Sequence, residues 1–164
     1  LHGNVRAEWE WEEVGMLDSA EALIQAGDVP PLIIVMPDGR YVSDTTSGGP
    51  NSYEAVVVDE LIPHIEATYC AAHHPRLRAI GGISRGGYWA LEIAFHHPGL
   101  FGAVGGHSPV VGSRGDPPSP MGQLAAADIP TTFTRWPGRH DRPYWRAHTP
   151  EYLAFYAASW DADK

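Results

Sequence analysis

The sequence of 164 residues lacks several features that define whole classes of protein. It has one cysteine, Cys70, so no internal disulfide bond can form. Its longest aliphatic run, Leu32 to Met36, is far shorter than the ~20 residues of a membrane-spanning helix, so we expect no membrane span. A basic segment followed by an apolar one, the pattern of a signal peptide, is also missing. Basic residues are scarce: 11 against 20 acidic ones give a net charge of −9, which disfavours nucleic acid as a partner.

The composition that remains is that of a folded globular protein. Hydrophobic residues make up 43% of the chain and charged residues 19%, which is too apolar for a disordered protein. A chain of this length can bury one core, whereas two full domains would be cramped, so we expect a single domain over residues 1–164. The 18 glycines and 15 prolines follow no period, which is typical of a loop-rich enzyme and excludes a collagen-like fibre.

Four short apolar segments predict β-strands. Leu32 to Met36 is a continuous aliphatic run between two prolines, and it predicts a strand buried on both faces, as in a parallel sheet. The other three predicted strands are Leu77 to Ile83, Phe101 to Gly106, and Thr131 to Trp136.

Helical signals lie between these segments. Asp18 with Glu21 fits a capping box, and Gly27 follows as a stop signal. Further helices are predicted from Asn51 to about Tyr69 with a kink or break at Pro63, from Tyr88 to His96, and from Thr149-Pro150 to Trp160. The alternation of strands and helices predicts an α/β layered fold with a parallel sheet, in which ligands bind at the carboxyl ends of the strands.

One motif in the chain carries a specific chemistry. Gly82-Ile83-Ser84-Arg85-Gly86 matches G-x-S-x-G, in which a serine sits on a strained turn between a strand and a helix. The motif requires that context, and here a predicted strand precedes Ser84 and a predicted helix follows it. The backbone N–H of Arg85 would then point towards an oxyanion formed at Ser84. The alternative is a glycine-lined turn with an inert serine.

These residues are part of a longer set of segments that all resemble one protein family. Gly81 to Tyr88, His97-Pro98, Phe101 to Pro109 and Pro137 to Asp141 resemble, in this order, the esterase D / feruloyl esterase-like branch of the α/β-hydrolases, which also contains enterochelin esterases and mycolyltransferases. The resemblance implies a mostly parallel sheet flanked by helices. It also implies a serine esterase or acyltransferase that acts on a small-molecule ester and needs no metal or organic cofactor.

A nucleophilic serine needs a base, and the base needs an orienting acid. In α/β-hydrolases these follow in the order serine, acid, histidine. By resemblance the base is His140, whereas His148 and the pairs His73-His74 and His96-His97 are expected at the surface. The acid by resemblance is Asp116, which precedes a proline; Asp128 and the absence of any acid stay open.

The remaining site predictions concern the oxyanion and the substrate. By resemblance, the second oxyanion donor is the backbone N–H of Asn4, after Gly3. His107 ends a predicted strand near Ser84, and could line the site. Trp136 and Trp145, with Tyr144, are close to His140 in sequence, and either form an aromatic substrate wall or pack in the core. We expect no metal site, because the chain has no H-E-x-x-H, H-x-H or Cys/His cluster.

The sequence departs from the family in two places. The sequence does not include the strands that normally precede His2-Gly3, as expected of a trimmed relative, a fragment or a sequence with omitted stretches. Only six residues separate Pro109 from Asp116, so we expect the strand before the acid to be shortened or missing. An unpaired sheet edge would favour homo-oligomers. The sequence thus predicts a serine carboxylesterase that hydrolyses small or aromatic esters through an acyl-enzyme on Ser84. The alternatives are acyl transfer to a sugar or lipid alcohol and a non-catalytic hydrolase scaffold.

Overall fold

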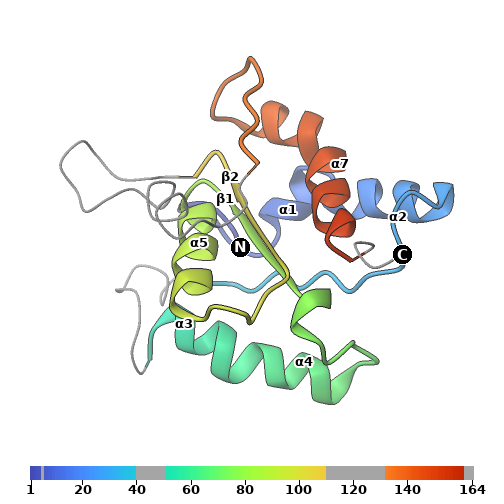
Figure 1. Ribbon diagram of the computed structural model, residues 1–164. Coiled ribbons are helices and arrows are strands. Elements are labelled where there is room, and N and C mark those ends of the chain that lie inside the picture. The colour runs from blue at the N-terminus through green and yellow to red at the C-terminus, as the bar shows by residue number, and fades with distance from the viewer. Residues whose placement is uncertain (5, 40–50, 110–131, 161–164) are drawn as a thin grey trace.

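The computed structural model describes residues 1–4, 6–39, 51–109 and 132–160 (Figure 1). Its helices and strands follow one another in this order: α1 (Glu10–Glu13), α2 (Met16–Ala26), α3 (Tyr53–Ala55), the π-helix η1 (Val56–Leu61), α4 (Ile62–Thr68), the 3₁₀-helix η2 (Pro75–Leu77), β1 (Ala79–Ile83), α5 (Arg85–His96), β2 (Ala103–His107) and α7 (Arg142–Ala158). No helix within these described ranges has the length and apolar character of a membrane span.

The two strands form a parallel pair joined by α5. Ala79 lies opposite Ala103 and Ile83 opposite His107, which confirms the strands predicted around residues 77–83 and 101–106. Leu1 continues the sheet on the other edge of β1, where the N–H of Ile83 donates to the carbonyl of Leu1 at 3.2 Å. The parallel pair with its crossover helix is the α/β arrangement that the sequence predicted.

The sheet is covered on both faces, because alternate residues of a strand point to opposite sides. On one face α7 packs with α1 and α2, and on the other face α5 packs with α3 and η1 (Figure 1). Ile83 belongs to the first apolar cluster and Ile80 to the second. The buried members of the first cluster are Trp11, Val14, Met16, Ala20, Ile83, Trp145, Tyr152 and Leu153.

A tyrosine of α7 contacts the sheet directly. A Cβ added to Gly81 would lie 1.7 Å from the Tyr156 hydroxyl oxygen, and one added to Gly105 would lie 2.1 Å from it. These glycines are neighbours on β1 and β2. The hydroxyl group therefore occupies the space that two side chains would fill, and α7 can approach the strands closely.

Two predicted strands are absent from the described residues. Residues 32–36 are extended but form no strand, and burial on both faces was wrong, because Ile33 is 49% exposed and Val35 is 37% exposed. Only Leu32, Ile34 and Met36 pack against the core. Residues 132–136 form no strand either, and Phe133 is 75% exposed. An apolar run does not reveal whether a partner strand is present. Within the described residues, neither of these two segments pairs with a strand.

The predicted capping box at Asp18 is wrong, whereas the stop at Gly27 is confirmed. Helix α2 begins at Met16, after Gly15 with φ 78°, and no side chain caps it. Asp18 instead lies within the first turn, where a carboxylate favours the helix dipole. Gly27 ends the helix with φ 80°, in the left-handed region that favours glycine.

The helix around Pro63 differs from its prediction in detail. Its cap is Ser52 and not Asn51, since the Ser52 hydroxyl accepts a hydrogen bond from Ala55 N at 3.1 Å. Pro63 does not break the helix: η1 precedes it, and Pro63 falls in the first turn of α4, where proline is tolerated. The helix ends at Thr68 with Tyr69 as its C-cap, close to the predicted end.

The last helix begins earlier than predicted. Asp141 caps α7 by accepting a hydrogen bond from Tyr144 N at 3.1 Å, so Pro150 lies inside the helix and not at its start. Thr149 is fully buried and donates its hydroxyl to the carbonyl of Trp145 at 2.9 Å. His148 is therefore also helical, and it stacks on Trp136 with ring centroids 4.3 Å apart, which corrects its expected surface position.

Candidate active site

Ser84 occupies the turn between β1 and α5, and its backbone is strained. Its φ of 54° and ψ of −113° are unusual for a residue with a side chain. A Cβ on Gly82 would lie 2.2 Å from the carbonyl carbon and oxygen of Gly86, and a Cβ on Gly86 would lie 2.3 Å from the carbonyl oxygen of Leu1. Glycine is thus required on both sides of Ser84, as the motif predicted.

Main-chain hydrogen bonds fix this turn to the sheet and to the helix. The N–H of Ser84 donates to the carbonyl of His107 at 2.9 Å, and its carbonyl accepts from Tyr88 N at 3.2 Å. Ser84 is 7% exposed. Its hydroxyl is consequently held at the carboxyl end of β1, where ligands bind in open α/β sheets.

His140 lies beside Ser84 although 56 residues separate them in sequence. Its Nε2 is 2.9 Å from Ser84 Oγ, within hydrogen-bonding distance. The imidazole packs at an 83° angle on Trp145, with ring centroids 5.0 Å apart. The Trp145 indole N–H in turn donates to Ser108 Oγ at 3.3 Å, and Trp145 is 6% exposed. Trp145 therefore supports the imidazole from the interior.

The two candidate acids, Asp116 and Asp128, lie outside the described residues. The carboxylate that follows the base directly in sequence is that of Asp141, which accepts the N–H of Tyr144 as the cap of α7. This cap places the start of α7 directly after His140. A Cβ on Gly138 would lie 2.1 Å from the Tyr144 ring, so the turn that carries His140 packs closely on the helix.

The loop of residues 2–4 lies on the other side of Ser84. A Cβ on Gly3 would be 3.6 Å from Ser84 Cβ. Asn4, the predicted second oxyanion donor, accepts a hydrogen bond from the Arg85 guanidinium through Oδ1 at 3.0 Å. The two residues whose backbone N–H groups were predicted to bind the oxyanion are thus linked by their side chains.

Buried His2 shapes this loop through both ring nitrogens. Its Nδ1 lies 2.8 Å from the carbonyl oxygen of Gly3, and Gly39 N donates to its Nε2 at 2.9 Å. Because Nε2 accepts, Nδ1 carries the proton and donates to Gly3. The ring thus uses both of its hydrogen-bonding positions within the protein.

Glu10 is a residue of this region that the sequence did not bring forward. Its carboxylate accepts a hydrogen bond from Gly3 N, and the residue is 1% exposed. Buried glutamates are rare unless they are paired, and Arg6 lies 3.7 Å away. The signal that could have identified it is its place between Trp9 and Trp11, in a segment rich in aromatic side chains.

The predicted substrate-binding residues are mostly interior. His107 is 8% exposed, lies 2.6 Å through Nε2 from the Tyr156 hydroxyl, and stacks on Tyr152 with centroids 3.7 Å apart. Burial lowers the pKa of His107 to about 3, so the ring is neutral. Trp136 is half-buried on His148, and Trp145 is buried. His107 and Trp145 have the packing of core residues.

The histidine pair His96-His97 contacts the carboxylate of Glu54. His96 Nδ1 lies 2.6 Å from one oxygen of Glu54 and His97 Nε2 lies 2.8 Å from the other. Burial disfavours the charged form of Glu54, but the hydrogen bonds and charges of the two imidazoles outweigh it and lower the pKa of Glu54. No group of three or more His, Cys, Asp and Glu side chains that could hold a metal occurs within the described part of the chain.

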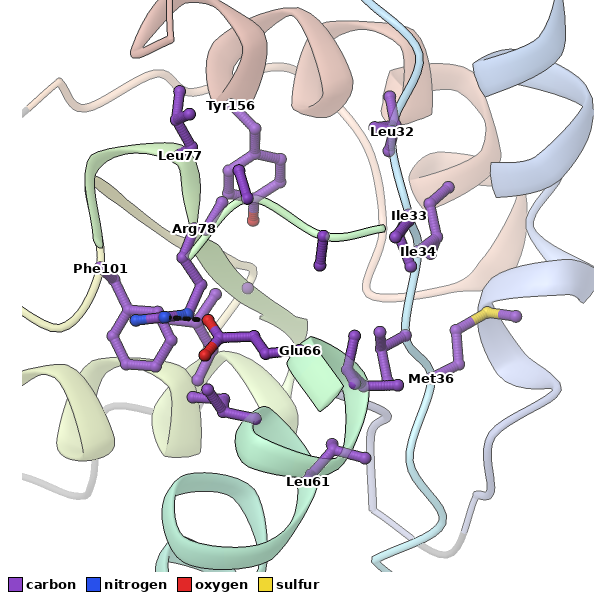
Figure 2. A pocket seen from close by; sticks show the side chains of 18 of the residues that line it. Leu32, Ile33, Ile34, Met36, Leu61, Glu66, Leu77, Arg78, Phe101 and Tyr156 are labelled. Atoms are coloured by element: carbon purple, nitrogen blue, oxygen red, sulfur yellow. Dashed lines mark hydrogen bonds and ion pairs between the residues drawn. The ribbon is translucent and has the colours of Figure 1, made fainter. Parts of the chain in front are cut away.

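A cavity of about 700 Å³ lies beside β1 (Figure 2). Apolar side chains line most of it, from residues 31–37 on one side and from Leu77, Ile80 and Phe101 on another. The Arg78–Glu66 ion pair lies at its edge in Figure 2. Neither Ser84 nor His140 is among the residues that line this cavity.

The chain is similar to several known proteins. The model of the family described as "Putative esterase" matches residues 11–154. Esterases of two Mycobacterium tuberculosis strains are 36% identical over 91 residues, which cover 52% of this chain. The endo-1,4-beta-xylanase/feruloyl esterase of Xylanibacter ruminicola is 31% identical over 110 residues, or 63% of this chain. These matches cover only 20% of each mycobacterial protein and 15% of the Xylanibacter one.

The fold has a relative of known structure. A ferulic acid esterase superposes with a TM-score of 0.77 and 21% identity, over 96% of this chain and 82% of the other. The likeness extends over nearly all of this chain, and it therefore concerns the whole layered arrangement and not one motif.

Proposed function

The chain belongs to the Esterase family, and from this premise we propose that it is a serine carboxylesterase with Ser84 as nucleophile and His140 as general base. The observation that carries the proposal is the 2.9 Å separation of His140 Nε2 and Ser84 Oγ at a strained strand-to-helix turn. A nucleophile within hydrogen-bonding distance of a base is the geometry that serine hydrolysis requires.

The proposed reaction proceeds through a covalent acyl-enzyme. His140 takes the proton of Ser84 as the oxygen attacks the acyl carbonyl, and the backbone N–H groups of Arg85 and Asn4 stabilise the resulting oxyanion. The tetrahedral intermediate collapses, and His140 gives the proton to the leaving alcohol. Water, deprotonated by the same histidine, then releases the acid. We propose Asp116 as the group that orients His140, on the resemblance of its sequence context.

The proposed substrates are small or aromatic carboxylic esters. Two observations support an aromatic acyl group: a sequence relative and a structural relative are both named as esterases of ferulic acid. The chain's net charge of −9 disfavours polyanionic substrates only weakly.

The test is hydrolysis of p-nitrophenyl acetate and methyl ferulate by the wild type, Ser84→Ala and His140→Gln. We expect both variants to lose at least about 10³-fold in kcat. Ser19→Ala on α2, away from the site, is the matched control and should keep the wild-type rate. A fluorophosphonate probe should label the wild type but not Ser84→Ala. Equal hydrolysis by wild type and Ser84→Ala would refute the proposal, and a folded wild type that the probe never labels would favour a non-catalytic scaffold.

A further inference from the structure

We propose that Glu10 is a positioning residue for the oxyanion site: its buried carboxylate fixes Gly3, and thereby aims the N–H of Asn4 at the acyl oxygen. This inference rests on the proposed function. It concerns a residue that does not touch the substrate, since a 1% exposed side chain cannot reach it.

The first step of the argument is the cost of burying Glu10. A carboxylate removed from water is stable only where hydrogen bonds and opposite charge compensate it. Its carboxylate accepts from the main-chain N–H of Gly3, lies 3.7 Å from the half-exposed guanidinium of Arg6, and interacts electrostatically with the amino group of Leu1. A residue that served only to begin the four-residue helix α1 could remain in solvent, as Glu12 does in the same helix. The burial of Glu10 brings its carboxylate to the N–H of Gly3.

The second step is the position of Gly3. A Cβ on Gly3 would lie 3.1 Å from Glu10 Oε2 and 3.6 Å from Ser84 Cβ, so Gly3 lies between the carboxylate and the nucleophile. Glycine has wide backbone freedom, and a glycine loop beside a nucleophile must be held from outside if its amides are to keep one direction. Preorganised donors are what make an oxyanion site effective.

The third step is how the two peptide groups around Gly3 are held. The N–H of Gly3 belongs to the first peptide group and is bound by Glu10. The carbonyl of Gly3 belongs to the second and accepts from His2 Nδ1 at 2.8 Å. In a trans peptide the N–H points opposite to the carbonyl, so the hold on Gly3 C=O sets the direction of the Asn4 N–H. The hydrogen bond to Glu10 prevents the His2–Gly3 peptide group from rotating. A rotation of that group would also turn the Gly3–Asn4 peptide group.

The substitutions separate the hydrogen bond from the charge. Glu10→Met removes the acceptor at similar size, and we expect kcat for p-nitrophenyl acetate to fall about 10- to 100-fold, part of the ~10²–10³ of a whole oxyanion donor, with KM within about twofold. Glu10→Gln keeps an acceptor oxygen and should stay within about threefold of the wild-type kcat. Glu12→Met, on the exposed side of α1, is the matched control and should leave kcat unchanged.

A second variant keeps the test decisive if Glu10→Met does not fold. Glu10→Asp retains the charge but withdraws the carboxylate by one methylene, and should lower kcat while preserving a cooperative thermal transition. For every folded variant, the affinity for a trifluoromethyl ketone inhibitor, which forms an oxyanion on Ser84, should fall in parallel with kcat/KM. A stabilising role alone would lower Tm and leave kcat and inhibitor affinity of the folded protein unchanged.

The outcomes distinguish this inference from the proposed function. If the wild type hydrolyses esters and Ser84→Ala does not, but folded Glu10→Met or Glu10→Asp keeps the wild-type kcat, the role of Glu10 is overturned and the esterase proposal stands. If Ser84→Ala is as active as the wild type, the proposed function fails, and the role of Glu10 fails with it.

Discussion

Replacement of His107 tests whether the buried imidazole makes the protein sensitive to acid. Burial lowers its pKa to about 3 from an ordinary value of 6.5. Between these values the unfolded chain binds a proton at this position that the folded protein does not bind, so protonation favours unfolding. The stability associated with neutral His107 is therefore complete above about pH 6.5 and is lost as the pH falls towards 3.

The size of the effect follows from the width of this interval. Each pH unit within it changes the free energy of unfolding by about 1.4 kcal/mol, so a fall from pH 6.5 to pH 5 costs about 2 kcal/mol through this residue alone. That is a large fraction of a typical stability of about 5–15 kcal/mol. His107→Gln removes the titration but keeps a polar partner for the Tyr156 hydroxyl, which lies 2.6 Å from the imidazole.

The assay is urea unfolding of wild type and His107→Gln at several values between pH 7 and pH 4.5. The variant is expected to be less stable at pH 7, because it loses the stacking of His107 on Tyr152, and to lose less stability on acidification. His64→Gln, which removes an exposed imidazole from α4, is the control for the loss of one histidine. Parallel pH profiles for wild type and His107→Gln would show that His107 titrates alike in both states, and would refute the reasoning.

Two further predictions concern the elements around the site. Gly82→Ala should lower the free energy of unfolding by more than about 3 kcal/mol in urea unfolding, because its Cβ would meet the backbone of Gly86 at 2.2 Å. Gly106 is the residue paired with Gly82 on β2, and a Cβ there would contact only side-chain atoms, at 3.1 Å or more. Gly106→Ala should therefore lower the free energy of unfolding less than Gly82→Ala, and equal decreases would contradict this account. Glu54→Gln should reduce the loss of Tm as the pH falls below about 4.5, because a carboxylate with a lowered pKa stabilises the protein fully above its unfolded pKa and ceases to do so as the pH falls through its folded pKa. Unchanged acid sensitivity in Glu54→Gln would contradict the role of His96 and His97 as its partners.

The parts of the fold that the sequence predicted depend on local chemistry. The strand before Ser84 and the helix after it were predictable because glycines, a short apolar run and a helical segment follow one another within a few residues. The motif also indicated a strained serine, and its φ of 54° agrees. Ser84 and His140 were singled out as partners and lie 2.9 Å apart, although their catalytic roles stay predictions.

The parts that were missed depend on distant residues. Residues 32–36 have the composition of a strand, but strand formation needs a neighbouring strand, which no local pattern reports. Two segments near the end of the chain combine a capping residue with a following proline, at Asp141 and at Thr149, so the sequence alone does not show which of them begins the helix. In the structure Asp141 is the cap, whereas Thr149 lies inside the helix and donates its hydroxyl to the distant carbonyl of Val14. Glu10 and Glu54 look like surface charges in the sequence, because their partners are 7 and more than 40 residues away.

The contact between Tyr156 and the two facing glycines means that three positions must change together if they change at all. Either glycine replaced alone would drive a methyl group into the phenol, and a smaller residue at 156 alone would leave a void above both strands. A directed-evolution library that randomises these sites singly will recover mainly the starting residues. One that varies them jointly can exchange the ring for side chains on the strands, and so reach packing solutions that stepwise substitution does not visit.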